Sequence, residues 1–220
     1  MRLSVVIPVL NEAARLPDLL ARLAQLDAQI IVVDGGSRDG SADLSRAAGV
    51  TVIDSAPGRA RQMNAGAAVA QGEVLLFLHA DTQLPAQADQ LILDALAAGR
   101  AWGRFDVIID GRPFMLRVIA ALMNLRSRLS GIATGDQAIF VTRTAFKAVG
   151  DFPEQPLMED IELSVRLKRL SPPACLRPPV RTSGRRWEQY GVWRTITLMW
   201  RLRWDYWRGV PAAQLAERYR

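Results

Sequence analysis

Acidic side chains stand directly after two apolar runs of this sequence, in positions suited to bind a cation or a nucleotide. Asp81 follows the run Glu73–Leu78, which is apolar after its first residue, and Asp34 follows Ile30–Val33. Ligands of open α/β sheets bind beyond the carboxyl ends of the strands. A hydrated Mg²⁺ or Mn²⁺ needs only one or two carboxylates plus substrate phosphates. We therefore expect a divalent metal at Asp81.

Asp34 opens a glycine-rich turn that nearly matches a dinucleotide fingerprint. The turn reads Gly-Gly-Ser-Arg-Asp-Gly, and Ser37 stands where the second glycine of the fingerprint belongs. A dehydrogenase interpretation is therefore weak. Two interpretations of Asp34 stay open: it accepts a hydrogen bond from a base or ribose, or it only caps the turn and the following helix.

A second acidic cluster lies at the start of a helix expected over Glu159–Leu170. Glu159, Asp160 and Glu162 fall in its first turn. Acids there interact favourably with the helix dipole, so capping alone would explain them. The functional interpretation is that one of them is a general base.

Histidine and cysteine are too rare for a structural zinc site. His79 is the only histidine and Cys175 the only cysteine, whereas structural zinc needs four such ligands. One cysteine allows no intrachain disulfide, which fits a reducing compartment. Together with the absence of a signal-peptide pattern in residues 1–10 and of any apolar run near 18 residues, this predicts a cytoplasmic protein. His79 itself is open to two interpretations, a packed residue or a ligand.

Charge is divided unevenly along the 220 residues. Residues 1–110 hold 9 basic and 13 acidic groups, whereas residues 111–220 hold 19 basic and 9 acidic groups. A basic half indicates an anionic partner such as a phosphorylated substrate, an acidic membrane face or nucleic acid. No nucleic-acid-binding motif accompanies it, so we expect no nucleic-acid partner.

The elements that must position these residues alternate between strand and helix. This order predicts a mainly parallel central sheet flanked by helices, of the nucleotide-binding α/β class. Pro8 is expected to stop the first strand. The expected strands are Leu3–Ile7, Ile30–Val33, Thr51–Ile53, Glu73–Leu78, Arg104–Ile109 and Ala138–Val141. The expected helices are Pro17–Leu26, Ser41–Ala48, one within Gly58–Gln71, Phe114–Leu129, Glu159–Leu170 and Arg186–Gly209.

Five of the six tryptophans lie in the stretch Trp187–Trp207. At 100° per residue, four of them share one helix face beside a stripe of arginines. The tryptophans are Trp193, Trp200, Trp204 and Trp207, and the arginines are Arg194, Arg201 and Arg208. Tryptophan beside arginine on an amphipathic helix suits a membrane interface, whereas core packing is the alternative. The helix expected at Phe114–Leu129 has a similar character.

Five ordered strings together resemble the family-2 glycosyltransferases with the GT-A fold. The strings are Val-Val-Ile-Pro-Val-Leu-Asn-Glu, Val-Val-Asp-Gly-Gly-Ser-Arg-Asp-Gly-Ser, Arg-Ala-Arg-Gln-Met-Asn-Ala-Gly, His-Ala-Asp and Met-Glu-Asp. The resemblance covers residues 3 to about 170, and the Thr182–Trp187 segment is similar to one in short bacterial members. It implies inverting transfer of a sugar from a nucleotide-diphosphate donor, by default a UDP-sugar, to an acceptor hydroxyl.

The resemblance also implies roles for individual residues. Asp160 would be the general base, and Asp81 would hold the metal on the diphosphate. The nucleotide would contact Pro8, Asn11, Glu12, Asp34, Arg61, Asn64 and Ala80. The donor sugar, diphosphate and acceptor would contact Gly135, Asp136, Gln137, Glu159, Arg185, Arg186 and Trp187. The family often has an acid where His79 stands, so this chain departs from the pattern there.

We expect one glycosyltransferase domain over residues 1–220. Its parts would be a nucleotide-binding half (1–110), an acceptor and catalytic part (111–180) and basic aromatic helices (181–220). The expected partners are a nucleotide-sugar and an acceptor that, if lipid-linked, would bring the chain to the inner face of the membrane through the Trp/Arg helix. The rival hypotheses are a non-catalytic nucleotide-sugar or membrane-surface binding relative, and a nucleotidyltransferase. The second is disfavoured because no lysine precedes Lys147.

Overall fold

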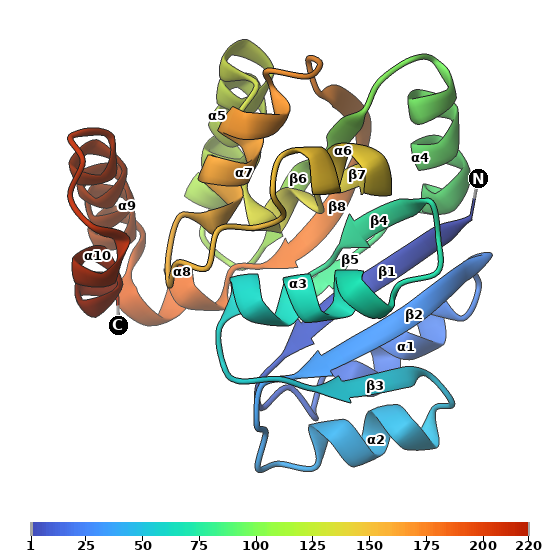
Figure 1. Ribbon diagram of the computed structural model, residues 1–220. Helices are drawn as coiled ribbons and strands as arrows, with labels where there is room; N and C mark the ends of the chain where they lie inside the picture. Colours follow the sequence, from blue (N-terminus) through green and yellow to red (C-terminus); the bar gives the residue numbers. More distant parts are fainter. Residues whose placement is uncertain (1, 220) are drawn as a thin grey trace.

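An eight-stranded sheet with helices on both faces forms the computed structural model, which describes residues 2–219 (Figure 1). The strand order is β3-β2-β1-β4-β7-β6-β8-β5. The strands are β1 Leu3–Val9, β2 Ala28–Asp34, β3 Thr51–Asp54, β4 Val74–Phe77, β5 Thr82–Gln83, β6 Trp102–Asp110, β7 Phe140–Thr142 and β8 Ala174–Ser183. The helices are α1 Leu16–Leu23, α2 Ser41–Ala47, α3 Arg59–Val69, α4 Ala88–Ala97, α5 Met115–Ser130, α6 Arg143–Ala148, α7 Glu159–Leu167, α8 Arg185–Tyr190, α9 Val192–Trp207 and α10 Ala212–Tyr219, with a 3₁₀ turn at Gly135–Gln137.

The first four strands are parallel, as the alternating pattern predicts. β1 pairs with β2 and β4, and β2 pairs with β3. Val9 lies opposite Asp34, and Asp34 opposite Asp54, so the carboxyl ends of these strands meet at one edge. Helix α3 packs tightly on the sheet, because a Cβ at Gly66 would come within 2.3 Å of Cγ1 of Val6.

Pro8 does not end the first strand, contrary to expectation. β1 continues to Val9 and pairs with β2 along its whole length. β4 pairs with β1 only from Leu3 to Val6. Pro8 therefore lies past the end of the β1–β4 ladder, where a residue without an N–H breaks no sheet hydrogen bond.

The second half adds strands in both directions. β7 runs antiparallel to β4 and β6, whereas β8 runs parallel to β6. β8 was not expected from the sequence. It contains Pro178 and Pro179, and the β6–β8 register shifts between Phe105 and Asp106, opposite these prolines. Because the pairing is irregular there, the two prolines, which have no N–H group, leave no regular sheet hydrogen bond unmade.

The long helix expected at Arg186–Gly209 is broken. Gly191 has a φ of 82°, a left-handed value that glycine adopts readily, and it separates α8 from α9. The chain then turns into α10. In Figure 1, α9 and α10 stand at the side of the molecule away from α1 and α2.

Candidate active site

Asp34 at the end of β2 stabilises its turn with one carboxylate oxygen and leaves the other without a hydrogen-bond donor. Its Oδ2 accepts the N–H groups of Gly36 at 3.0 Å and Ser37 at 2.8 Å. Its Oδ1 is buried and has no hydrogen-bond partner among the described residues. A buried acceptor of this kind is costly unless a ligand satisfies it. Both interpretations of Asp34 are thus compatible with its geometry.

The loop after β1 is fastened to the loop after β2. Asn11, with a φ of 56°, accepts the N–H of Arg38 with its side-chain oxygen at 2.9 Å, and its own N–H donates to Oγ of Ser37 at 2.9 Å. The Glu12 carboxylate lies 3.8 Å from the guanidinium of Arg185. Glu12 therefore links this loop to α8, more than 170 residues further along the chain.

Gln62 of α3 holds the ends of β1 and β2 together, a role that sequence reasoning missed. Its Nε2 donates to the carbonyl oxygens of Val9 at 2.9 Å and Val33 at 2.8 Å. Asn64, two residues on, exchanges two hydrogen bonds with the backbone of Phe152, at 2.9 and 3.0 Å. Its amide fastens the loop ahead of α7, and its expected nucleotide contact stays a prediction.

Asp81 lies beside the end of β8. Its carbonyl oxygen accepts the N–H of Ser183 at 3.2 Å, and Thr82 pairs with Thr182 through their hydroxyls at 3.1 Å. Ala80, just before it, is buried. These contacts bring the segment that contains Arg185 to the tip of β4.

The Asp81 carboxylate fits a metal shared with substrate. Its Oδ1 accepts only the hydroxyl of Thr82, at 3.3 Å, and no basic side chain within residues 2–219 forms an ion pair with it. Over the same residues, no three His, Cys, Asp or Glu side chains converge as an all-protein metal cage would require. One free carboxylate that needs phosphate oxygens to complete the shell suits Mg²⁺ or Mn²⁺.

His79 packs against the Gly135–Gln137 turn. A Cβ on Gly135 would come within 2.4 Å of Cε1 of the imidazole, so only glycine fits there. Nδ1 of His79 lies 3.6 Å from Oδ1 of Asp136. Burial acts to raise the pKa of Asp136, but its contact with His79 and the charge of Arg59 hold that pKa below its usual range. His79 therefore faces an anionic carboxylate.

Asp160 is anchored to the same turn. Its Oδ2 accepts the N–H of Gly135 at 2.8 Å, and its Oδ1 accepts the N–H of Ile161 at 2.7 Å. Burial raises the pKa of Asp160, and burial together with the Asp160 charge raises the pKa of the neighbouring Glu159. Both carboxyls line a small cavity with His79 and Gly135. A carboxylate with a raised pKa is a better general base.

Arg59, rather than Arg61, faces this acidic cluster. Despite the burial that opposes it, the pKa of Arg59 is raised by Tyr219, Glu159, Asp136 and Asp160. The Arg61 guanidinium instead lies 3.4 Å from Glu154 on the surface. From the sequence, a phosphate or base contact and a solvated helix face are equally open for Arg59, and the nucleotide contact that the resemblance implies for Arg61 stays a prediction. Their different surroundings follow from the start of α3 at Arg59.

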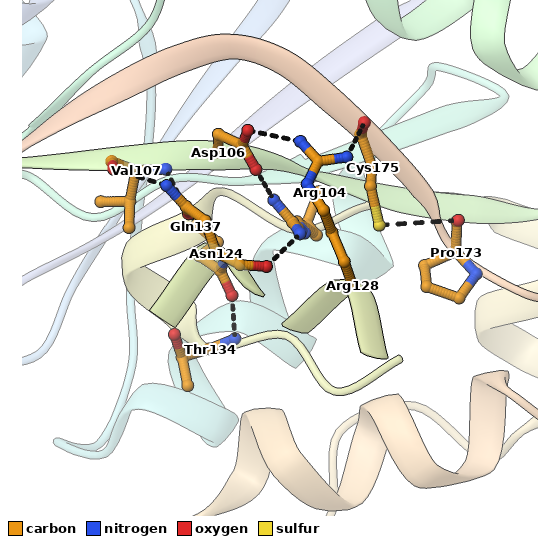
Figure 2. Close-up of polar contacts among 9 residues, drawn as sticks. All are labelled: Arg104, Asp106, Val107, Asn124, Arg128, Thr134, Gln137, Pro173 and Cys175. Carbon is orange, nitrogen blue, oxygen red and sulfur yellow. Dashed lines mark hydrogen bonds and ion pairs between the residues drawn. The ribbon is translucent and has the colours of Figure 1, made fainter. Parts of the chain in front are cut away.

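A buried polar network holds the turn from behind (Figure 2). Asn124 of α5 accepts the N–H of Val107 at 2.9 Å and donates to its carbonyl at 3.0 Å. Gln137 reaches Oδ1 of Asn124 at 3.5 Å and accepts the N–H of Thr134 at 3.3 Å. Gln137 is fully buried and positions the turn, and its expected contact with the donor sugar and acceptor stays a prediction.

The same network contains an ion cluster. The fully buried Arg104 pairs with Asp106, which also binds Arg128 (Figure 2). Arg104 further donates to the carbonyl of Asn124 at 3.2 Å. A buried charge is tolerated only when it is paired and hydrogen-bonded. The cluster thereby fixes β6 and α5 relative to each other, and with them the turn.

Helix α8 supplies the last three expected residues. Arg185 contacts Glu12, as described above, and Trp187 is partly buried against the main core. The Arg186 guanidinium lies 3.8 Å from the centroid of the Tyr219 ring and donates to the Tyr219 carbonyl. Helix α10 therefore lies against both Arg186 and, through Tyr219, the surroundings of Arg59.

Comparison with known proteins identifies the family. The profile described as glycosyl transferase family 2 matches residues 4–149. The chain belongs to glycosyl transferase family 2. An undecaprenyl-phosphate 4-deoxy-4-formamido-L-arabinose transferase from Aeromonas hydrophila is 34% identical over 110 residues, 44% of this chain and 34% of that protein. The enzyme of the same name from Pseudomonas fluorescens is 34% identical over 154 residues, 60% of this chain and 44% of its own. This family-2 chain thus spans less than half the length of these relatives.

Solved structures show the same GT-A fold. A mannosyltransferase from Pyrobaculum calidifontis, in complex with GDP-Man and Mn²⁺, has a TM-score of 0.63 and 21% identity over 83% of this chain and 56% of its own. Glucosyl-3-phosphoglycerate synthase from Mycobacterium tuberculosis, in complex with Mn²⁺, UDP and glucosyl-3-phosphoglycerate, has a TM-score of 0.59 and 19% identity. The match covers 81% of this chain and 70% of that protein. At these identities the likeness concerns the fold alone, and it confirms the expected GT-A architecture of the family-2 chain.

Proposed function

We propose that this family-2 chain is an inverting glycosyltransferase that moves a sugar from a nucleotide-diphosphate donor, with UDP as the default nucleotide, to an acceptor. The observation that carries the proposal is the meeting of two groups of carboxylates. Asp34 ends β2 and Asp81 follows β4, the two parallel strands that flank β1, and Asp160 is hydrogen-bonded at 2.8 Å to the turn against which His79 packs. Asp34 and Asp81 suit the nucleotide-sugar donor, and Asp160 suits the acceptor.

The nucleotide would lie over the ends of β1 and β2. The unpaired buried Oδ1 of Asp34 is available to a base N–H, and the loop of Asn11 and Glu12 forms the rim. Arg185 and Arg186 would bind the diphosphate oxygens, since they closely follow Ser183, whose N–H donates to the carbonyl of Asp81. Guanidinium groups suit phosphate because they can donate two parallel hydrogen bonds.

Asp81 would hold a Mg²⁺ or Mn²⁺ ion together with the donor diphosphate. When bound, the ion supplies Lewis-acid stabilisation of the negative charge that develops on the departing nucleoside diphosphate. Support for the metal comes from the free Asp81 carboxylate and from the Mn²⁺ in the two solved complexes named above.

Asp160 would take the proton of an acceptor hydroxyl as that hydroxyl attacks the anomeric carbon. An alcohol is a weak nucleophile at neutral pH, and positioned proton transfer contributes about 10²–10⁴-fold. Burial keeps the pKa of Asp160 above its usual range, which improves its match to this task. Glu159, Asp136 and Gly135 would line the place where sugar and acceptor meet.

A phosphate acceptor is a second candidate, favoured by the names of the curated relatives, which are undecaprenyl-phosphate transferases. A lipid phosphate is already ionised at neutral pH, so its oxygen needs no general base. The two acceptors therefore predict different consequences of losing Asp160. With a phosphate acceptor, Asp160 would act mainly through its charge and its hold on Gly135.

A lipid-linked acceptor would bring the protein to a membrane surface. Helix α9 supports this, because its tryptophans Trp193, Trp200, Trp204 and Trp207 are exposed rather than packed in the core, contrary to one of the two interpretations of the sequence. Trp beside Arg favours the headgroup region of a bilayer. We propose that the chain works at the cytoplasmic membrane face through α9.

Ligand-dependent thermal stabilisation tests this function. The melting temperature is measured with UDP, GDP and dTDP, each with and without Mn²⁺. We expect one diphosphate to raise it, and to do so more with Mn²⁺, because a ligand that binds only the folded state stabilises it. Transfer from the matching nucleotide-sugar to short polyprenyl phosphates and to alcohols then identifies the acceptor. Binding without any turnover would favour the non-catalytic alternative, and no stabilisation by any diphosphate would reject the proposal.

A further inference from the structure

Helix α5 leaves one apolar face uncovered. Along this face the side chains are between 39% and 80% exposed. The residues are Phe114, Val118, Leu122, Leu125 and Leu129. At 100° per residue they fall within one narrow arc of the helix. Isolated exposed leucines are ordinary, but a continuous stripe of five large apolar residues on one helix marks an interaction site.

The opposite face of α5 is the one that packs on the protein. Leu116, Ile119 and Ala120 are buried in the main core cluster. The exposed stripe is therefore not a core face that the fold has left loosely packed. Arg117 flanks the stripe, with its guanidinium 5.9 Å from the centroid of the Phe114 ring. The stripe thus carries a cationic border, as on interfacial helices.

Helix α9 likewise has one buried face and one exposed apolar face. Leu202 and Thr195 are buried on its inner face, and the four tryptophans on its outer face are 58% to 76% exposed. The stripe of Arg194, Arg201 and Arg208 runs beside them. None of these three arginines forms an ion pair within residues 2–219. Their charge is thus available to an anionic partner.

The two helices approach each other at their starts. Glu188 of α8, which leads into α9, accepts the N–H of Arg112 just before α5 at 2.7 Å. A Cβ on Gly184 would come within 2.9 Å of Cδ1 of Leu116, so α8 also touches the first turn of α5. In Figure 1, α9 stands at the left of the molecule beyond α8, and α5 lies above the sheet.

We propose that α5 lies flat on an anionic lipid bilayer and, together with α9, forms a two-helix membrane-docking surface. Three observations favour lipid over a protein partner. Both faces are the outer sides of helices rather than grooves, tryptophan and arginine dominate α9, and the half of the chain that contains them carries an excess of ten basic groups. No helix among the described residues is long and apolar enough to cross a bilayer. The sixteen residues of α5, about 24 Å long, suit an interfacial position.

The docking deepens the proposed function, since it would hold the site against lipid-linked acceptors, but binding itself requires no turnover. The experiment is co-sedimentation of the full chain with vesicles of phosphatidylcholine alone and of phosphatidylcholine with phosphatidylglycerol. The α5 variant is Leu122→Glu/Leu125→Glu, with α9 unchanged. The matched control is Leu44→Glu/Val69→Glu, which places the same two charges on exposed apolar residues of α2 and α3.

We expect the wild type and the control to bind the anionic vesicles and the α5 variant to bind them at least about tenfold less tightly. Replacing Arg194, Arg201 and Arg208 by glutamine should weaken binding on the order of 100-fold, since each cation near an anionic surface contributes about fivefold. Circular dichroism and UDP–Mn²⁺ stabilisation of each variant separate a docking defect from misfolding or from failure of the proposed function.

Two outcomes would overturn the proposal. One is vesicle binding that is absent in the wild type or unaffected by the α5 variant. The other is a wild-type dimer in solution that the α5 variant converts to a monomer without any change in vesicle binding, which would assign the α5 face to a second copy of the chain.

Discussion

The N–H of Gly135 donates to Oδ2 of Asp160 at 2.8 Å, across 25 residues of sequence. This bond joins the start of α7 to the turn against which His79 packs. The Ile161 N–H donates to the other oxygen, so the orientation of the Asp160 carboxyl is fixed, while burial raises its pKa. A fixed carboxyl with a raised pKa is what proton abstraction requires, and it leads to a first prediction.

Asp160→Asn should lower turnover with a hydroxyl acceptor by about 10²–10⁴-fold while leaving donor binding intact. The amide oxygen can still accept the Gly135 N–H, so the turn should hold, while the Ile161 N–H loses its side-chain acceptor. The measurement is initial rate of transfer beside UDP–Mn²⁺ thermal stabilisation. Full turnover in the variant would rule out Asp160 as the base. A loss of only a fewfold with a phosphate acceptor would favour that acceptor instead.

The same substitution should remove a pH-dependent component of the stability, apart from the constant cost of losing one of the two backbone N–H bonds. The folded-state pKa of Asp160 is raised by burial, so the carboxylate contributes unfavourably once pH exceeds the ordinary Asp range. Wild-type stability should fall as pH rises from that range through the raised folded value, and Asp160→Asn should lack this component. Melting temperatures of both proteins from acid to neutral pH check it. The same dependence of melting temperature on pH in both proteins would contradict the prediction.

Arg59 and Arg61 offer a matched pair for pH dependence. The Arg59 charge lowers the pKa of Asp160, although burial dominates, whereas Arg61 lies beside Glu154. Arg59→Gln should therefore raise the pKa of Asp160 further and move the acid limb of kcat/KM to higher pH, since the base must be ionised. Arg61→Gln should leave the limb in place. Equal shifts in both variants would show that Arg59 has no special relation to the base.

Removal of the metal should have the same effect as removal of Asp81. With EDTA, or in Asp81→Asn, the extra stabilisation by a nucleoside diphosphate in Mn²⁺ should vanish. The whole stabilisation by the diphosphate with Mn²⁺ is about 2.7 kcal/mol when free ligand is a hundredfold above Kd. The control is Asp54→Asn, which neutralises a carboxylate at the neighbouring end of β3. Retention of the Mn²⁺ effect in Asp81→Asn would place the metal elsewhere.

Asn124 should matter for stability although it lies behind the site. Asn124→Ala leaves the N–H and carbonyl of Val107 without their partners, which costs about 1–3 kcal/mol of unfolding free energy. The control is Gln90→Ala, which removes an exposed amide that bonds only Asp94, and it should change stability by less than about 0.5 kcal/mol. Urea denaturation measures both. Similar small changes in the two variants would show that the network of Figure 2 contributes little.

Local patterns in the sequence predict the first four parallel strands and the edge at which their carboxyl ends meet. Apolar runs that end in Asp34 and Asp81 predict parallel strands with carboxylates at one edge, because strand direction in such folds is set by the helices between them. The exposure of the α9 tryptophans agrees with the membrane-interface interpretation of the sequence rather than with core packing. These features depend on residues close in sequence, so a local pattern is enough to predict them.

Tertiary structure decided which of several similar residues meet. Arg59 rather than Arg61 faces the acidic cluster. The Gly135 N–H donates to Asp160, and β8 brings Ser183 to Asp81 across about a hundred residues. β8 was not predicted, because its two prolines argue against a strand. The register shift between β6 and β8 allows the strand to contain them. Such contacts depend on long-range register and packing, which no short window of sequence specifies.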